Sequence, residues 1–199
     1  VFPDRVEDGC VCVADGRIVH AGGMENAPSV GEHIDCRDDY IAPGFLDIHC
    51  HAGAGWWAYD DPEKMAAYHL SHGTTGLLCT LYRDVPREKI LETADRVKKL
   101  MLQGSNLLGL HLEGPYLNPA YGSGSSDCQG ETVDPGQYLP IADTGIVRQW
   151  TFSPEVAGTE RFLRDICQRG IVPSIGHSAA SPEQVAHAAE NGARIVTHL

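Results

Sequence analysis

Five residues of the types that bind metal ions stand at the ends of apolar, strand-like runs. His49 and His51 close the first run, Glu113 closes the second, and His177 and His198 close two later ones. Parallel α/β barrels carry their chemistry where their strands end, so these side chains are expected to converge on one pocket. Imidazole and carboxylate groups are metal ligands, and this placement favours a metal-dependent hydrolase built on a barrel.

The histidine pair is the strongest single motif. His49 and His51 are two positions apart, so on a strand both point to the same side. Core packing explains such a pair poorly, because each buried imidazole would need its own polar partner. Asp47 is expected on the same face, where its carboxylate would fix the tautomer of a ligand ring. His111, two positions before Glu113, is assigned a similar supporting or structural role.

Glu113 and Glu155 both stand at the ends of strand-like runs, so their roles must be compared. It precedes a Gly-Pro pair that ends its strand, where a carboxylate is either a metal ligand or a solvated loop residue. Glu155 follows another strand in a similar position, so position alone does not separate the two roles. The lysines of the chain all lie in helical stretches: Lys64, Lys89, Lys98 and Lys99. A carboxylated lysine bridging two metals is therefore not available here, and Glu113 is the candidate for that central position.

The elements that must position these residues alternate between strands and helices. Strands are expected at 44–50, 75–80, 107–112, 147–152, 171–175 and 195–197. Helices with capping signals are expected from residue 61, over 84–103, over 159–170 and over 181–192. About six such units predict most of a (β/α)8 TIM barrel. An open doubly wound sheet is the alternative, although no Gly-x-Gly-x-x-Gly motif opens a helix after the first strand.

The first forty or so residues have a different character. Two short β-type runs flank Asp15-Gly16, which is a hairpin signal. Residues 1–41 are therefore expected to form part of a small β-rich subdomain, and residues 42–199 the N-terminal portion of the barrel. Complete barrels take about 250 residues. We therefore expect this chain of 199 residues to be a fragment that lacks the last strands.

Composition argues against several other classes of protein. A hydrophobic content of 42% and a charged content of 21% suit a globular domain with a substantial core. The formal net charge of -12 disfavours nucleic acid as a partner. No apolar run is long enough to span a bilayer. The seven cysteines include no Cys-x-x-Cys pair, which disfavours a zinc ribbon and suits a reducing compartment.

Other chemically capable residues receive structural interpretations. Cys50 alternates with its two histidine neighbours and is expected in the core. His69 and His187 fall in helical stretches and are expected on their surfaces. Trp56 and Trp57 follow the first strand and are interpreted as anchors of a packed loop.

The residues described above resemble the amidohydrolase superfamily and, within it, the N-acetylglucosamine-6-phosphate deacetylases. The matching stretches run through nearly the whole chain: 42–51, 72–75, 109–119, 153–155, 176–178 and 197–199. The Leu-Glu-Gly-Pro segment at 112–115 is the most specific, because related hydantoinases and dihydroorotases typically use a lysine where Glu113 stands. The His-x-His motif identifies only the superfamily.

The resemblance implies a (β/α)8 barrel flanked by a small β-sandwich. It implies Glu113, His177 and His198 as ligands of the main divalent ion, with His49 and His51 holding a second ion in two-metal members. One or two ions are expected, zinc before iron or manganese. The implied reaction is hydrolysis of N-acetylglucosamine-6-phosphate to glucosamine-6-phosphate and acetate in amino-sugar catabolism. The implied protein is a cytoplasmic homodimer whose catalytic aspartate lies beyond Leu199.

One loop departs from the family pattern. After Asn118-Pro119 the deacetylases usually reach a histidine that contacts the sugar, and here Ser125 of a Gly/Ser-rich loop occupies roughly that position. Substrate-binding residues are therefore not assigned. Two alternatives stay open: another amidohydrolase acting on a different amide or cyclic amide, and a catalytically inactive metal-binding relative.

Overall fold

The computed structural model describes residues 1–29, 31–121 and 132–198. The chain divides into two compact units, Val1–Gly44 and Phe45–Leu199. In the first unit, β1 (Cys10–Ala14) and β2 (Arg17–Gly22) form an antiparallel hairpin, followed by a short 3-10 helix at Met24–Asn26. Asp15 and Gly16 make the turn with φ angles of 50° and 71°, a conformation that suits glycine at the second position. This hairpin is the small β-rich region expected from the sequence.

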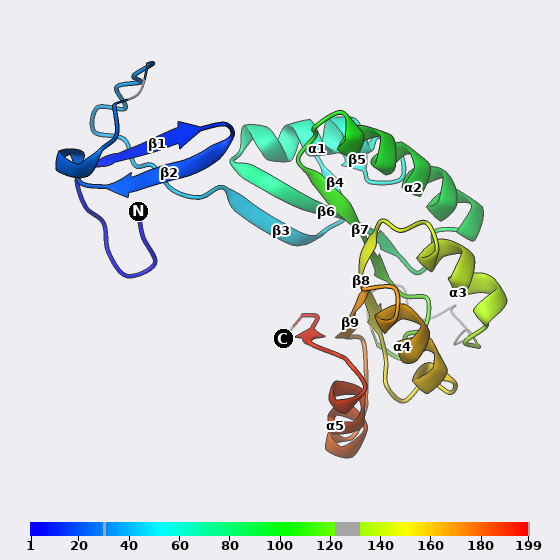
Figure 1. Ribbon diagram of the computed structural model, residues 1–199. Coiled ribbons are helices and arrows are strands. Elements are labelled where there is room, and N and C mark those ends of the chain that lie inside the picture. Colours follow the sequence, from blue (N-terminus) through cyan, green and yellow to red (C-terminus); the bar gives the residue numbers. More distant parts are fainter. Residues whose placement is uncertain (30, 122–131, 199) are drawn as a thin grey trace. The chain divides into compact units, whose positions relative to one another are not determined.

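The second unit is built on a curled sheet of parallel strands (Figure 1). Its six strands lie in the order β10-β9-β8-β7-β6-β3. Their bounds are β3 Phe45–Cys50, β6 Thr74–Tyr82, β7 Leu107–Glu113, β8 Val147–Phe152, β9 Val172–Ile175 and β10 Ile195–Val196. Each strand pairs in parallel with the next of the series, as in a TIM barrel. The open doubly wound alternative is therefore wrong, and the predicted partial barrel is confirmed.

Within the part of the chain that the structure describes, five helices connect these strands. They are α1 Pro62–Ser71, α2 Arg87–Leu102, α3 Pro135–Ala142, α4 Thr159–Cys167 and α5 Pro182–Glu190. The predicted caps of α1 and α5 form, because Asp61 accepts a hydrogen bond from the Lys64 amide and Ser181 closes a capping box with Gln184. A short antiparallel pair, β4 (Ala52–Gly53) and β5 (Trp56–Trp57), follows β3.

The start of one helix and the presence of another differ from the sequence-based expectation, and α4 and α5 end slightly before the predicted residues 170 and 192. α2 begins at Arg87 rather than near Asp84, because Pro86 occupies its N-cap. α3 was not predicted, although Asp134 accepts a hydrogen bond from the Gly136 amide and a proline follows it in the first turn. The helix is short, so its apolar periodicity is weak as a signal. Among the described residues, no helix is both long and apolar enough to cross a membrane.

The core lies between the sheet and its helices. Leu77, Leu110, Trp150 and Phe162 are completely buried there. Register places Tyr82 beside Glu113 and Glu113 beside Thr151 on neighbouring strands. The carboxyl ends of β6, β7 and β8 therefore meet at one edge of the sheet, which is where the chemical residues were expected.

Candidate metal centre

The Glu113 carboxylate lies among four imidazole rings. Its Oε1 atom is 2.8 Å from Nε2 of His177 and 2.8 Å from Nε2 of His198. Its Oε2 atom is 3.0 Å from Nε2 of His51 and 3.5 Å from Nε2 of His49. The Glu113 side chain is only 7% exposed. The structure thus brings together all five side chains that the sequence placed at strand ends.

The two carboxylate oxygens divide the histidines into two pairs. Oε1 faces the rings that follow β9 and β10, and Oε2 faces the rings of β3 and its end. Burial alone would raise the pKa of the Glu113 carboxyl, but hydrogen bonds with His49, His51 and His177 outweigh it and hold the pKa far below its usual range. Glu113 is therefore a permanent negative charge with imidazole nitrogens on both sides. Among the described residues, His49, Glu113 and His198 have ligand atoms within 4.8 Å of one another.

Neighbouring strands orient the pair on β3. His51 Nδ1 lies 3.2 Å from the Thr80 carbonyl oxygen, and this contact orients the ring so that Nε2 faces Glu113. The Cys50 amide, between the two histidines, donates to the Thr80 hydroxyl at 2.9 Å. The Nε2 atoms of His49 and His51 are 3.2 Å apart. One residue of β6 thus holds both the backbone and a ring of the His-x-His motif.

The other two histidines occupy strained turns. His177 and His198 have φ angles of 51° and 57°, a left-handed conformation that non-glycine residues rarely adopt. The Ser153 hydroxyl is 2.9 Å from the His177 carbonyl oxygen and donates to it. Gly176 precedes this turn, and a Cβ there would meet Thr151 Cγ2 at 2.7 Å and Thr197 Cβ at 2.9 Å. There is therefore no room for a side chain immediately before the turn that presents His177.

His111 supports the centre without facing Glu113. Its Nδ1–H donates to the Ile48 carbonyl at 3.1 Å, and its Nε2 accepts from the Thr151 hydroxyl at 2.7 Å. Burial, reinforced by the nearby His49, lowers the pKa of His111 to about 3, so the ring stays neutral. Its centroid is 4.7 Å from that of His49. His111 therefore fixes the end of β3 from the barrel interior.

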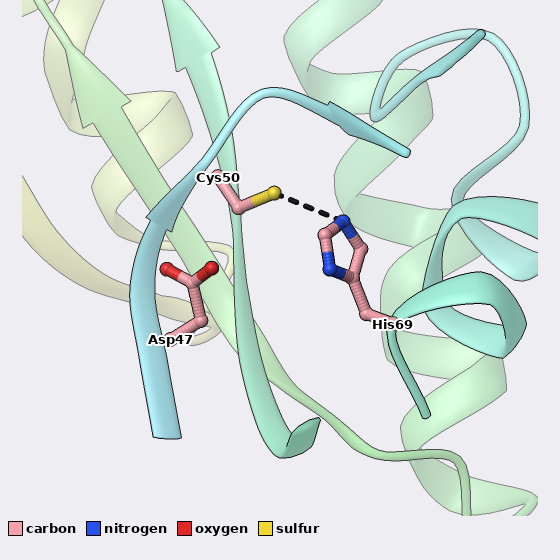
Figure 2. Close-up of side chains that lie close together, drawn as sticks. All are labelled: Asp47, Cys50 and His69. Carbon is pink, nitrogen blue, oxygen red and sulfur yellow. Dashed lines mark hydrogen bonds between the residues drawn. The ribbon is translucent and has the colours of Figure 1, made fainter. Parts of the chain in front are cut away.

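Asp47 is placed differently from the expectation. Its carboxylate accepts a hydrogen bond from the His49 backbone amide at 3.0 Å, not from an imidazole ring. The β3–β6 pairing is irregular between Asp47 and Cys50, which breaks the strict alternation of side chains that the expectation assumed. Figure 2 shows the Asp47 carboxylate on the same side of β3 as the Cys50 thiol, with His69 of α1 opposite.

His69 and Cys50 also depart from their sequence-based interpretations. His69 is half-buried rather than on the helix surface, and its Nε2 lies 3.1 Å from Cys50 Sγ. Cys50 is half-buried rather than part of the closed core. The missed signal was helical spacing, because His69 follows the buried Met65 and Ala66 by four and three positions and so shares their face.

Glu155 provides the contrast to Glu113. Its carboxylate accepts from Asn118 Nδ2 at 2.9 Å, from the Ser178 hydroxyl at 2.6 Å and from the Ala179 amide at 2.6 Å. Burial would raise its pKa, but these hydrogen bonds hold the pKa below its usual range. Glu155 therefore links the loop after β7 to the segment after β9.

An aromatic cluster flanks the His51 side of the centre. Tyr82 contacts the His51 ring with centroids 5.5 Å apart, and Trp57 contacts Tyr82 at 5.7 Å. Trp57 also stacks on Tyr59 at 6.0 Å, but Trp56 and Trp57 are 41% and 39% exposed, so they anchor the loop less closely than expected. Trp56 instead lies under the Lys64 ammonium group, 3.9 Å away. The Gly/Ser-rich loop with Ser125, and Cys128 within it, lie outside the described residues.

Comparison with known proteins gives a consistent result. No family model matches the chain. The N-acetylglucosamine-6-phosphate deacetylase of Danio rerio is 30% identical over 179 residues, which cover 83% of this chain and 44% of the relative. The human enzyme of that name is 29% identical over 94% of this chain and 49% of its own length.

Solved structures of N-acetylglucosamine-6-phosphate deacetylases are also similar to this chain. A mutant N-acetyl-D-glucosamine-6-phosphate deacetylase from Mycobacterium smegmatis, in complex with N-acetyl-D-glucosamine-6-phosphate, superposes with a TM-score of 0.81 at 27% identity. That match covers 95% of this chain and 50% of the other. The Thermotoga maritima deacetylase gives a TM-score of 0.78 at 28% identity, covering 95% and 49%. The chain is therefore related to the N-acetylglucosamine-6-phosphate deacetylases and spans about half of their length.

Proposed function

We propose that the complete protein is a metal-dependent deacetylase that hydrolyses N-acetylglucosamine-6-phosphate to glucosamine-6-phosphate and acetate. The observation that carries this proposal is the Glu113 carboxylate with four imidazole nitrogens 2.8–3.5 Å from its oxygens. The relatives that carry this activity in their names align over most of the chain. The proposed protein is a cytoplasmic homodimer whose partner is a small N-acetylated phosphosugar.

The donor set fits one or two divalent ions. Glu113 Oε1, His177 and His198 would hold the main ion, and Oε2 with His49 and His51 a second. Imidazole nitrogen and carboxylate oxygen suit zinc, with iron and manganese as the next candidates. The structural test of this fit is which donors lie on each side of Glu113. Each oxygen of one buried carboxylate lies beside a pair of ring nitrogens, so each side offers one anionic oxygen and two imidazole nitrogens that could hold a cation.

The residues of this chain would position the reactants. A bound divalent ion supplies the chemistry of lowering the pKa of a water molecule and polarising the acetamide carbonyl. Thr80 keeps the His51 Nε2 atom directed at the site, and the neutral His111 holds β3 in place. The aspartate that transfers protons is expected beyond residue 199.

The deciding experiment is acetate release by the complete protein. N-acetylglucosamine-6-phosphate and unphosphorylated N-acetylglucosamine are compared, and metal content is measured on the same sample by plasma mass spectrometry. We expect turnover with a strong preference for the phosphorylated sugar, and loss of both turnover and metal in Glu113→Gln. The matched control, Glu155→Gln, should keep its metal.

Three other results would change the conclusion. Bound metal without turnover of either sugar would move the substrate to a different amide. Bound metal without turnover of any amide or cyclic amide tested would indicate an inactive metal-binding relative. Turnover that persists after complete removal of metal would overturn the proposed chemistry.

A further inference from the structure

A second group of metal-type donors lies on the α1 side of β3, and the proposed function does not use it. Cys50 stands between His49 and His51 on the strand and points the other way, towards α1. Asp47, Cys50 and His69 have ligand atoms that all lie within 4.8 Å of one another, and all three residues are half-buried (Figure 2).

Two donor atoms of this group form a nearly regular triangle with the backbone carbonyl oxygen of Ala52. Cys50 Sγ is 3.1 Å from His69 Nε2 and 3.3 Å from the Ala52 carbonyl oxygen, which is itself 3.1 Å from His69 Nε2. A sulfur and a nitrogen bound to one tetrahedral zinc ion are about 3.5 Å apart. The three atoms are therefore already spaced as neighbouring ligands of a single ion would be, after a small outward relaxation.

Two hydrogen bonds to one carbonyl hold this triangle together when no ion is bound. The Cys50 thiol donates to the Ala52 carbonyl oxygen, and the second lone pair of that oxygen accepts from Nε2–H of His69. A cation bound among the three atoms would take the place of both hydrogens. Gly53 allows the approach, because a Cβ there would meet His69 Nε2 at 2.8 Å and Tyr68 Cδ1 at 2.9 Å. The backbone is thus shaped to bring the imidazole up to the thiol and the carbonyl.

We propose that Cys50, His69 and Asp47 bind a thiophilic divalent cation, zinc in the first place, at a site distinct from the Glu113 centre. Thiolate and imidazole ligands select zinc over magnesium or calcium. The thiolate and the Asp47 carboxylate supply two negative charges, which balance the ion, and the Ala52 carbonyl completes four donors. The thiol proton is released to solvent on binding. Such an ion would tie α1 to the strand that carries His49 and His51.

Cobalt substitution tests the proposal, because the two centres differ in sulfur. The complete protein is stripped of metal and titrated with Co²⁺ alone. A thiolate bound to cobalt gives an intense charge-transfer absorption in the near ultraviolet, and the nitrogen and oxygen donors around Glu113 do not. We expect this band in the unmodified protein. We expect its loss in Cys50→Ser, with one fewer cobalt ion per chain, and a clear weakening in His69→Gln.

Two control variants distinguish cobalt bound at Cys50 from cobalt bound at other cysteines or at the Glu113 centre. Cys10 and Cys12 have sulfur atoms 3.9 Å apart, so the variant Cys10→Ser with Cys12→Ser must keep the band. Glu113→Gln should lose cobalt from the main centre and keep the band, which distinguishes failure of the proposed function from failure of this site. Absence of the band at cobalt saturation, or its persistence in Cys50→Ser, would overturn the proposal.

A measurement on the unmodified protein tests the proposed site even if the variants fail to fold. X-ray absorption at the zinc edge should show a sulfur neighbour at about 2.3 Å in addition to nitrogen and oxygen. A zinc-loaded protein with only nitrogen and oxygen neighbours would refute the proposal regardless of how Cys50→Ser behaves.

Discussion

Glu113 and Glu155 follow neighbouring strands, each next to a proline-containing loop, yet their surroundings differ completely. The Glu113 carboxylate oxygens lie close to ring nitrogens of four histidines, which come from three strand ends. The Glu155 carboxylate accepts hydrogen bonds from a side-chain amide, a hydroxyl and a backbone N–H. Both carboxyls have a lowered pKa, so the direction of the shift does not separate them. The chemical type of the neighbouring groups separates them. Imidazole nitrogens can bind a cation, whereas the amide and hydroxyl groups donate hydrogen bonds that hold the carboxylate in place.

The largest difference is expected when each glutamate is changed to glutamine. Glu113→Gln removes the negative charge of the carboxylate among the four rings, so we expect loss of bound metal. Activity should fall by more than about 100-fold, beyond the 10–100-fold that supporting residues cost. Glu155→Gln should keep the metal. Metal content and acetate release, measured on both variants, make this comparison. Equal metal loss in both variants would show that the two carboxylates do not differ in role.

The next largest effect should distinguish histidines near Oε1 of Glu113 from histidines near Oε2. His177→Asn removes a ligand on the Oε1 side, and His51→Asn removes one on the Oε2 side. We expect the first to abolish turnover and the second to lower the metal count from two ions to one with partial activity retained. Equilibrium dialysis against Zn²⁺ with parallel kinetics measures both. Identical stoichiometry in the two variants would contradict a division of the ligands between two ions.

A substitution at Gly176 should disturb both glutamates at once. The residues after it contact Glu113 through His177 and Glu155 through Ser178. A methyl group at Gly176 would press on Thr151 and cost about 1–3 kcal/mol of unfolding free energy. Urea denaturation of Gly176→Ala gives this cost, and zinc affinity of the same variant should also fall. Gly145→Ala is a matched control for space, because nothing lies within 4 Å of its added methyl group, although its φ of 75° still carries strain.

The smallest effect concerns the pH dependence of Glu155. Its folded-state pKa lies below the unfolded value of about 4.3, so its charge stabilises the fold above that pH. Relative to Glu155→Gln, the unmodified protein should be more stable by about 1 kcal/mol at neutral pH, since charged hydrogen bonds exceed neutral ones by that order. This advantage should vanish as the pH falls from about 4.3 through the lower folded pKa. Urea midpoints between pH 7 and 3 follow it, and a difference that does not change with pH would exclude a charge effect.

Much of this molecule follows from local sequence signals. The six strands, four of the helices and the turn of the hairpin are set by apolar runs, capping residues and glycines, which act over a few positions. The five candidate ligands share one property, their place at the end of a strand, and parallel strands necessarily gather such residues at one edge. Alternation along β3 likewise suffices to separate Cys50 from its two histidine neighbours.

Only the tertiary structure decided the remaining features, because they depend on contacts between distant parts of the chain. Glu113 and Glu155 are equivalent by position, and they differ because His177 and His198 reach one carboxylate from 64 and 85 residues away. The turn of Asp47 away from the imidazoles arises from an irregular pairing with β6, which the sequence of β3 does not reveal. His69 meets Cys50 because α1 packs closely against β4, where Gly53 has no side chain. Local preferences specify the elements, and close packing between them specifies which donors share a site.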